Sequence, residues 1–100
     1  MKTVEGLEHE DLTDKIIGCA IEVHKKLGPG FLESIYENAF VIELHKQNLQ
    51  VEKQREVVVK YDGAEVGRHR LDLIVNDTIV VELKLLKILK ISILLLLNPI

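Results

Sequence analysis

Asp72, Glu82 and Lys84 are the residues of this 100-residue chain whose types and spacing best suit chemistry. Glu82 and Lys84 are two residues apart in an apolar run, and side chains alternate faces along a strand, so both project from the same side. Two carboxylates on neighbouring strands can bind a divalent cation, and an ammonium group beside them can orient a water or a phosphate oxygen. The alternative is a surface ion pair between Glu82 and Lys84, which is common and contributes little stability.

Three predicted strands position these residues. A run rich in β-branched side chains leads into Asp62-Gly63, a strong signal for a two-residue hairpin turn, and Asn76-Asp77 marks a second turn. An antiparallel meander of this kind brings Asp72 and Glu82 near each other across the second turn. The predicted strands span residues 51–61, 64–75 and 78–84.

Two predicted helices precede the strands. Asp11 or Thr13 can cap the first helix, and Gly28-Pro29-Gly30 ends it. A second apolar stripe at helical spacing runs from about Phe31 to Lys46. The apolar positions of the first helix are Ile16, Ala20, Val23 and Leu27. The sequence therefore predicts one domain over residues 1–100, with residues 1–10 frayed.

The composition limits the classes of partner. The chain is 47% apolar and 29% charged, which is typical of a globular protein, and its net charge of -3 argues against a generally basic nucleic-acid-coating protein. Only 4% of residues are aromatic and none is Trp, so the chain has few side chains on which single-stranded bases could stack. Basic side chains flank the carboxylates in sequence, where they suit a phosphate or are simply solvated; they are Arg68, Arg70, Lys84, Lys87 and Lys90.

The cysteine and histidine content excludes other sites. Cys19 is the one cysteine, so no disulfide framework or cysteine-rich zinc site forms within the chain, and a cytoplasmic setting fits best. The start of the chain shows no pattern of a secretory signal. The four histidines show no zinc-site pair on one helix face. His69 is expected to face away from Asp72 and to be exposed to solvent.

Gly30-Phe31-Leu32-Glu33-Ser34-Ile35-Tyr36 has the form Gly-x-x-Glu-x-x-Tyr, and two further motifs, Arg70-Leu71-Asp72-Leu73 and Val81-Glu82-Leu83-Lys84, follow it in order. In these motifs the chain resembles the GxxExxY proteins of the PD-(D/E)XK nuclease superfamily, over about residues 11–84. The resemblance implies an α/β (α+β) fold with a restriction-endonuclease-like core. Two N-terminal helices are then expected to pack on a three-stranded antiparallel meander.

The resemblance also implies hydrolysis of phosphodiester bonds in DNA or RNA. Asp72, Glu82 and Glu33 are then expected to bind Mg²⁺ or Mn²⁺, and Lys84 to position or activate the attacking water. Arg70, Gly30 and Tyr36 are expected to support the site. From the residues alone, Glu33 is better explained by the dipole at a helix N-terminus, and Tyr36 by a half-buried core tyrosine with a satisfied hydroxyl. The alternative function is a non-catalytic module that binds nucleic acid or protein on the same scaffold.

Residues 85–100 depart from the pattern of these proteins, which continue with a helix and then an apolar strand. Six residues separate Lys84 from the next apolar run, whereas a parallel return needs about a dozen. The sequence therefore predicts a domain that is incomplete at the C-terminus and that self-associates through this exposed apolar segment. The segment is too short and too interrupted by lysine to span a membrane. A helical alternative remains open, because some of its residues share a helix face; they are Leu86, Leu89, Ile93 and Leu96.

Overall fold

A computed structural model describes residues 10–85 and 89–96 of the chain. The predicted fraying of residues 1–10 lies outside these ranges, except that Glu10 is helical. No helix in the described ranges is both long enough and apolar enough to cross a membrane. The elements are α2 (Glu10–Leu27), α3 (Glu33–Lys46), β1 (Val51–Tyr61), β2 (Ala64–Val75), β3 (Ile79–Leu85) and β4 (Leu89–Leu95).

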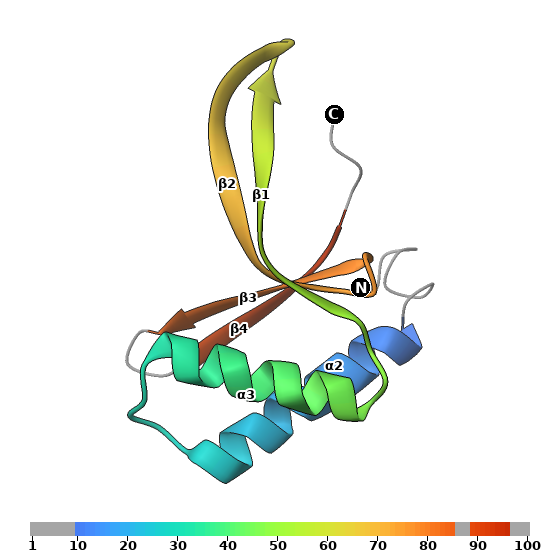
Figure 1. The fold of residues 1–100 in the computed structure, drawn as a ribbon, viewed down its shortest axis with the longest axis vertical. Helices are drawn as coiled ribbons and strands as arrows, with labels where there is room; N and C mark the ends of the chain where they lie inside the picture. The colour runs from blue at the N-terminus through green and yellow to red at the C-terminus, as the bar shows by residue number, and fades with distance from the viewer. Residues whose placement is uncertain (1–9, 86–88, 97–100) are drawn as a thin grey trace.

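The two helices pack on one side of the sheet (Figure 1). In each helix the buried side chains recur every three or four residues, which places them on a single helix face. The buried helix residues are Ile16, Cys19 and Val23 in α2 and Tyr36, Phe40 and Leu44 in α3. They form one core with sheet residues that face the helices, namely Leu73, Val75, Ile79, Val81 and Leu83.

The sheet is a meander in the order β1-β2-β3-β4, with each strand antiparallel to the next. Both predicted turns are confirmed. Asp62 and Gly63 have φ values of 51° and 79°, and Asn76 and Asp77 have φ values of 51° and 52°. Two successive residues with positive φ are the mark of a type I′ turn, whose twist suits a two-residue hairpin. Beyond the sheet, β1 and β2 continue as a two-stranded arm that projects away from the helices (Figure 1).

The α+β class is confirmed, but the described residues form four strands and not three. β4 pairs antiparallel with β3 from Ile79↔Leu95 to Leu85↔Leu89. The connection that is too short for a parallel return suits this pairing, because an antiparallel neighbour needs no long crossover. The helical alternative is also wrong for Leu89–Leu95, while Leu86 lies outside the described residues. Alternate side chains of β4 pack against the core; these are Ile91, Ile93 and Leu95.

Glu43 of α3 is a nearly buried carboxylate, 9% exposed, that joins the two helices. It accepts a hydrogen bond of 2.8 Å from the Nζ of Lys26 and a longer one of 3.4 Å from Lys46. The hydrogen bond from Lys26 lowers the pKa of Glu43, and the same contact raises the pKa of Lys26. The pair therefore stabilises the fold above the ordinary glutamate pKa, and this stability is lost as the pH falls through the lowered pKa of the folded state.

We expect Glu43→Gln to unfold at a lower temperature than the parent at neutral pH, because Lys26 loses a charged partner. The difference should shrink as the pH falls below about 4.3, the ordinary glutamate value, and should vanish below the lowered pKa of the folded state, where Glu43 of the parent is also neutral. Thermal unfolding followed by circular dichroism across this range measures both curves. Glu56→Gln, at an exposed carboxylate of the arm, is the control. Parallel curves for Glu43→Gln and the parent would contradict the role of this ion pair.

Candidate functional site

The predicted site residues Asp72, Glu82 and Lys84 lie where β2 separates from β3. The ladder between these strands covers only three pairs and ends at Leu73↔Val81. Asp72 is the next residue of β2, and its Oδ2 accepts a hydrogen bond of 2.9 Å from the backbone N–H of Leu83. The carboxylate of Asp72 thus takes the place of a backbone hydrogen-bond partner at the point where the two strands separate. We call this point the fork, and it consists of Asp72 on β2 and Glu82–Lys84 on β3.

Glu82 and Lys84 project from the face of β3 that is turned away from the helices. Val81 and Leu83 alternate with them and are buried in the core, with Leu83 5% exposed. Leu83 is therefore buried behind Glu82 and Lys84. Lys84 is exposed and lies opposite Lys90 of β4. Among the described residues no carboxylate lies within ion-pair distance of Lys84. Lys84 and Lys90 therefore place two like charges opposite each other on neighbouring strands.

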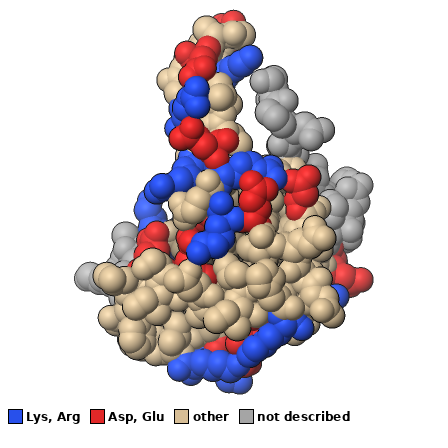
Figure 2. Space-filling model, viewed as in Figure 1, with Lys and Arg blue, Asp and Glu red and all other residues tan. Residues whose placement is uncertain are grey.

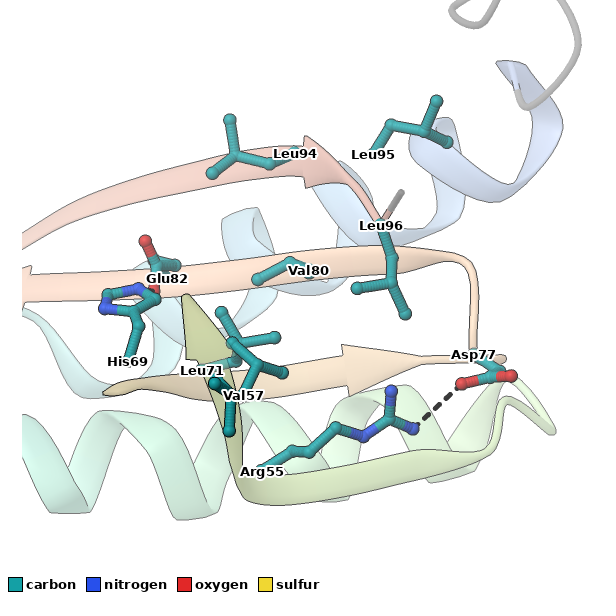
Figure 3. Close-up of a pocket in the computed structure, with 11 residues that line it drawn as sticks. Arg55, Val57, His69, Leu71, Asp77, Val80, Glu82, Leu94, Leu95 and Leu96 are labelled. Atoms are coloured by element: carbon teal, nitrogen blue, oxygen red, sulfur yellow. Dashed lines mark hydrogen bonds and ion pairs between the residues drawn. The ribbon is translucent and has the colours of Figure 1, made fainter. Parts of the chain in front are cut away.

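Glu82 lines a groove of about 610 Å³ on this second face of the sheet. Figure 3 shows the groove between the arm and the strands β3 and β4. Its floor is apolar and includes part of a second, smaller buried cluster formed by Leu71, Ile74 and Val80. The lining residues are Arg55, Val57, Val58, His69, Leu71, Asp77, Val80, Glu82, Leu94, Leu95 and Leu96.

Contacts between titratable side chains are found at two places in the groove, and Figure 3 marks the one between Arg55 and Asp77 with a dashed line. Near the turn between β2 and β3, Arg55 pairs with Asp77 at 2.8 Å and with Glu52 at 2.6 Å. The hydrogen bond from Arg55 lowers the pKa of Glu52. At the second place in the groove, the Nε2 of His69 lies 3.4 Å from the Oε2 of Glu82. The groove therefore places the site carboxylate Glu82 beside the arm.

The sequence did not predict the contact between His69 and Glu82. The side chain of His69 is 56% exposed, so the predicted solvent exposure is correct. Strand alternation assumes a regular strand, however, whereas β2 is irregular around Asp72. Leu71 belongs to the cluster on the groove face, while Leu73, two residues further on, faces the helices. This change of face directs His69 into the groove toward Glu82.

Tyr36 and Gly30 shape the loop between α2 and α3. Tyr36 is 1% exposed, and its hydroxyl donates to the carbonyl oxygen of Gly28 at 2.6 Å and accepts from the N–H of Phe31 at 3.3 Å. Gly30 has φ of 104°, a conformation that side chains other than hydrogen rarely allow. Both residues thus have a structural role at the entrance to α3. The hydroxyl of Tyr36 is satisfied, in accord with the interpretation as a core tyrosine.

Glu33 and Arg70 are exposed residues at the borders of this region. Glu33 lies in the first turn of α3, where the helix dipole favours a carboxylate. Arg70 lies on the arm and pairs in register with Glu56 of β1. Figure 2 shows acidic and basic side chains intermixed along the arm. The arm therefore presents no extended surface of one charge sign on this face.

Asp72 and Glu82 are the two carboxylates at the fork that suit a divalent cation. Mg²⁺ usually keeps several waters and takes only one or two protein carboxylates, so two such ligands are enough for this class of ion. The described residues contain no group of three or more His, Cys, Asp or Glu side chains close enough to share one ion. The structure thus does not bring Glu33 together with the other two, and its role as a third ligand stays a prediction.

The comparisons with known proteins bear on the whole of this arrangement. A family model described as the PD-(D/E)XK nuclease superfamily matches residues 10–93. The matched range includes both helices, the first three strands and most of β4. A search of curated proteins and a search of solved structures each returned no match.

Proposed function

Because the chain belongs to the PD-(D/E)XK nuclease superfamily, we propose that it hydrolyses phosphodiester bonds in DNA or RNA with the help of Mg²⁺ or Mn²⁺. The observation that carries the proposal is the fork. There Asp72 comes from one strand and Glu82 from the next, with Lys84 two residues further along the exposed face of β3. A cytoplasmic setting suits the chain, since its one cysteine, Cys19, can form no disulfide within the chain.

Each residue at the fork has a distinct part in this proposal. Asp72 and Glu82 would hold the cation, which when bound neutralises charge on the phosphate and lowers the pKa of a bound water. Asp72 keeps one oxygen on the N–H of Leu83, which fixes the direction of the carboxylate. Lys84 adds a positive charge near the scissile phosphate and orients the attacking water. Glu33 would support the ion from α3.

Lys84→Ala tests the proposal in a nuclease assay on single- and double-stranded DNA and RNA with Mg²⁺ or Mn²⁺. We expect the rate to fall by about 10²–10³, the usual loss when one preorganised charge or hydrogen-bond donor is removed from a reacting centre. Lys90→Ala is a matched control, because Lys90 is also exposed and lies directly opposite Lys84 on β4. Cleavage that is equal in Lys84→Ala and the parent would favour a binding module or a contaminating nuclease over the proposed activity.

The second candidate is a binding module without cleavage, and the apolar floor of the groove favours it. A pocket of several hundred cubic ångströms with a few polar groups is the usual form of a binding site. Calorimetric titration with Mg²⁺ and Mn²⁺ separates the two functions when combined with the cleavage assay. Absence of cation binding would exclude the nuclease reading. Cation binding without cleavage of any of the four substrates would favour the binding module.

We expect the chain to self-associate through the apolar segment 85–100. Within its described part, Leu94 is 51% exposed on the groove face, and β4 is an edge strand rich in Ile and Leu. Apolar edge strands pair readily with other chains. Light scattering at micromolar concentration should give a mass at least twice that of one chain, and Leu94→Lys should reduce it. A single-chain mass for the parent would contradict this expectation.

A further inference from the structure

β1 bends at Gln54, the residue that faces the fork. Gln54 has φ of 60°, a left-handed conformation that is uncommon for residues other than glycine, asparagine and aspartate. The ladder between β1 and β2 contains Lys53↔Leu73 and Arg55↔Leu71 but no pair between them. The two residues left between these pairs are Gln54 and Asp72. The backbone irregularity of β1 therefore lies directly across from the site carboxylate.

The side chain of Gln54 is bound to α3. Its Nε2 donates to both oxygens of Glu37, at 3.2 and 3.1 Å. Glu37 is only 9% exposed, and carboxylates are seldom buried to this extent unless they are paired. Lys53 adds a contact of 3.7 Å to the same carboxylate. The bend in β1 is thus tied to the helix layer by a charge-assisted contact between an amide and a nearly buried carboxylate.

The bend and the fork coincide along the sheet. Gln54 lies opposite Asp72 in β1, and Asp72 has turned its carboxylate to the N–H of Leu83. On β2, the residues on either side of Asp72 face opposite sides of the sheet. A regular β1 would pair with Asp72 and extend the flat ladder through this point. Strained backbone conformations persist only where the surroundings enforce them, and they gather at functional sites.

We infer that Gln54 and Glu37 are a positioning pair for the cation site. Their contact holds β1 bent, and the bent strand leaves Asp72 free of the β1 ladder, so that its carboxylate lies at the fork beside Glu82. Neither residue touches the substrate or the ion in this scheme. The inference rests on the proposed function for the role of Asp72, but the geometry that it predicts can be measured without any cation.

The test uses the amide of Leu83 as a reporter, because this N–H donates to Asp72. Gln54→Gly removes the side-chain contact while permitting the positive φ, and Glu37→Gln removes the charge while keeping the shape. Asp72→Ala gives the limit in which the Leu83 amide has lost its partner. Asn38→Ala is the matched control, since it breaks a neighbouring contact of 2.9 Å between α3 and Lys53 of β1 without touching Gln54.

In the full chain we expect hydrogen exchange at the Leu83 amide to be at least tenfold faster in Gln54→Gly and Glu37→Gln than in the parent, approaching the Asp72→Ala limit. Mn²⁺ affinity, measured by calorimetry, should fall by about 10–100-fold, as for other residues that orient a metal ligand. Asn38→Ala should change neither quantity. The unfolding temperature of each variant identifies a general loss of stability, and Glu37→Gln serves if Gln54→Gly does not fold.

Unchanged exchange at Leu83 in both variants would overturn the inference, and so would an equal change in Asn38→Ala. If the parent binds no Mn²⁺, the proposed function fails. Exchange at Leu83 then still decides whether the pair positions Asp72. If Mn²⁺ binds and its affinity depends on Asp72 but not on Gln54 or Glu37, the proposed function stands and the positioning pair is excluded.

Discussion

Asp72→Asn is expected to weaken the binding of Mg²⁺ or Mn²⁺ by more than about 100-fold, because a direct ligand should exceed the effect of groups that only orient one. The substitution removes the negative charge but retains a carbonyl oxygen at the same place. That oxygen can still accept the N–H of Leu83, so the fork should remain folded. Cleavage of nucleic acid should be lost together with cation binding.

Two further variants give this expectation its controls. Asp72→Ala removes the acceptor as well as the charge, and the buried N–H of Leu83 then loses its partner, which costs about 1–3 kcal/mol of stability. Asp62→Asn makes the same chemical change at the tip of the arm and should alter neither binding nor stability. Calorimetric titration and thermal unfolding measure the two effects separately. Cation binding by Asp72→Asn at the parent's affinity would exclude Asp72 as a ligand.

Tyr36→Ala is expected to have the largest effect on stability, about 3–5 kcal/mol, because it removes a fully buried ring from the core. Tyr36→Phe should cost about 1–3 kcal/mol, because the carbonyl of Gly28 and the N–H of Phe31 then lose the hydroxyl. In a domain of this size each kcal/mol lowers the unfolding temperature by about 4–8 °C. Neither variant should alter cation affinity at a temperature where it is folded.

Tyr61 provides the matched comparison, since it is 71% exposed on the arm. Tyr61→Ala and Tyr61→Phe should change the free energy of unfolding by less than about 0.5 kcal/mol. Denaturant unfolding followed by circular dichroism measures all four variants. A Tyr36→Phe protein as stable as the parent would show that the hydroxyl is dispensable for the loop. It would then reopen a functional role for the tyrosine of the Gly-x-x-Glu-x-x-Tyr motif.

The parts of the fold that the sequence predicts well are those set by local chemistry. The turns at Asp62-Gly63 and Asn76-Asp77 follow from residues that tolerate positive φ, and the bounds of β1 and β2 follow from these turns. The helix periods predict most of the core face correctly, but Phe31 and Ile35 at the start of the second stripe are exposed. β4 was missed as an antiparallel strand because an apolar run fits a strand or a helix equally well, and its partner depends on the tertiary fold.

The candidate site was only partly predictable for a similar reason. Strand alternation and two turns bring Asp72, Glu82 and Lys84 to neighbouring strands. A register shift between Val59 and Lys60 then moves the pairing of β1 by one residue, so that Gln54 lies across from Asp72. The residue types at that bulge do not predict the register shift. The contact of His69 with Glu82 depends on the change of face of β2 around Asp72, and the contact of Gln54 with Glu37 depends on how α3 packs against β1, so neither could be read from the sequence.

The arm has a consequence for the groove that it borders. One wall of the groove, formed by β3 and β4, rests on the helices and the main core, whereas the other belongs to a ribbon of two strands. Two strands without a further layer are only marginally stable and open more readily than a packed sheet. The groove thus combines a stiff side, which carries Glu82, with a compliant side, which carries His69. Its width is set by the bending of the arm, and amides of the arm should exchange with solvent before those of β3.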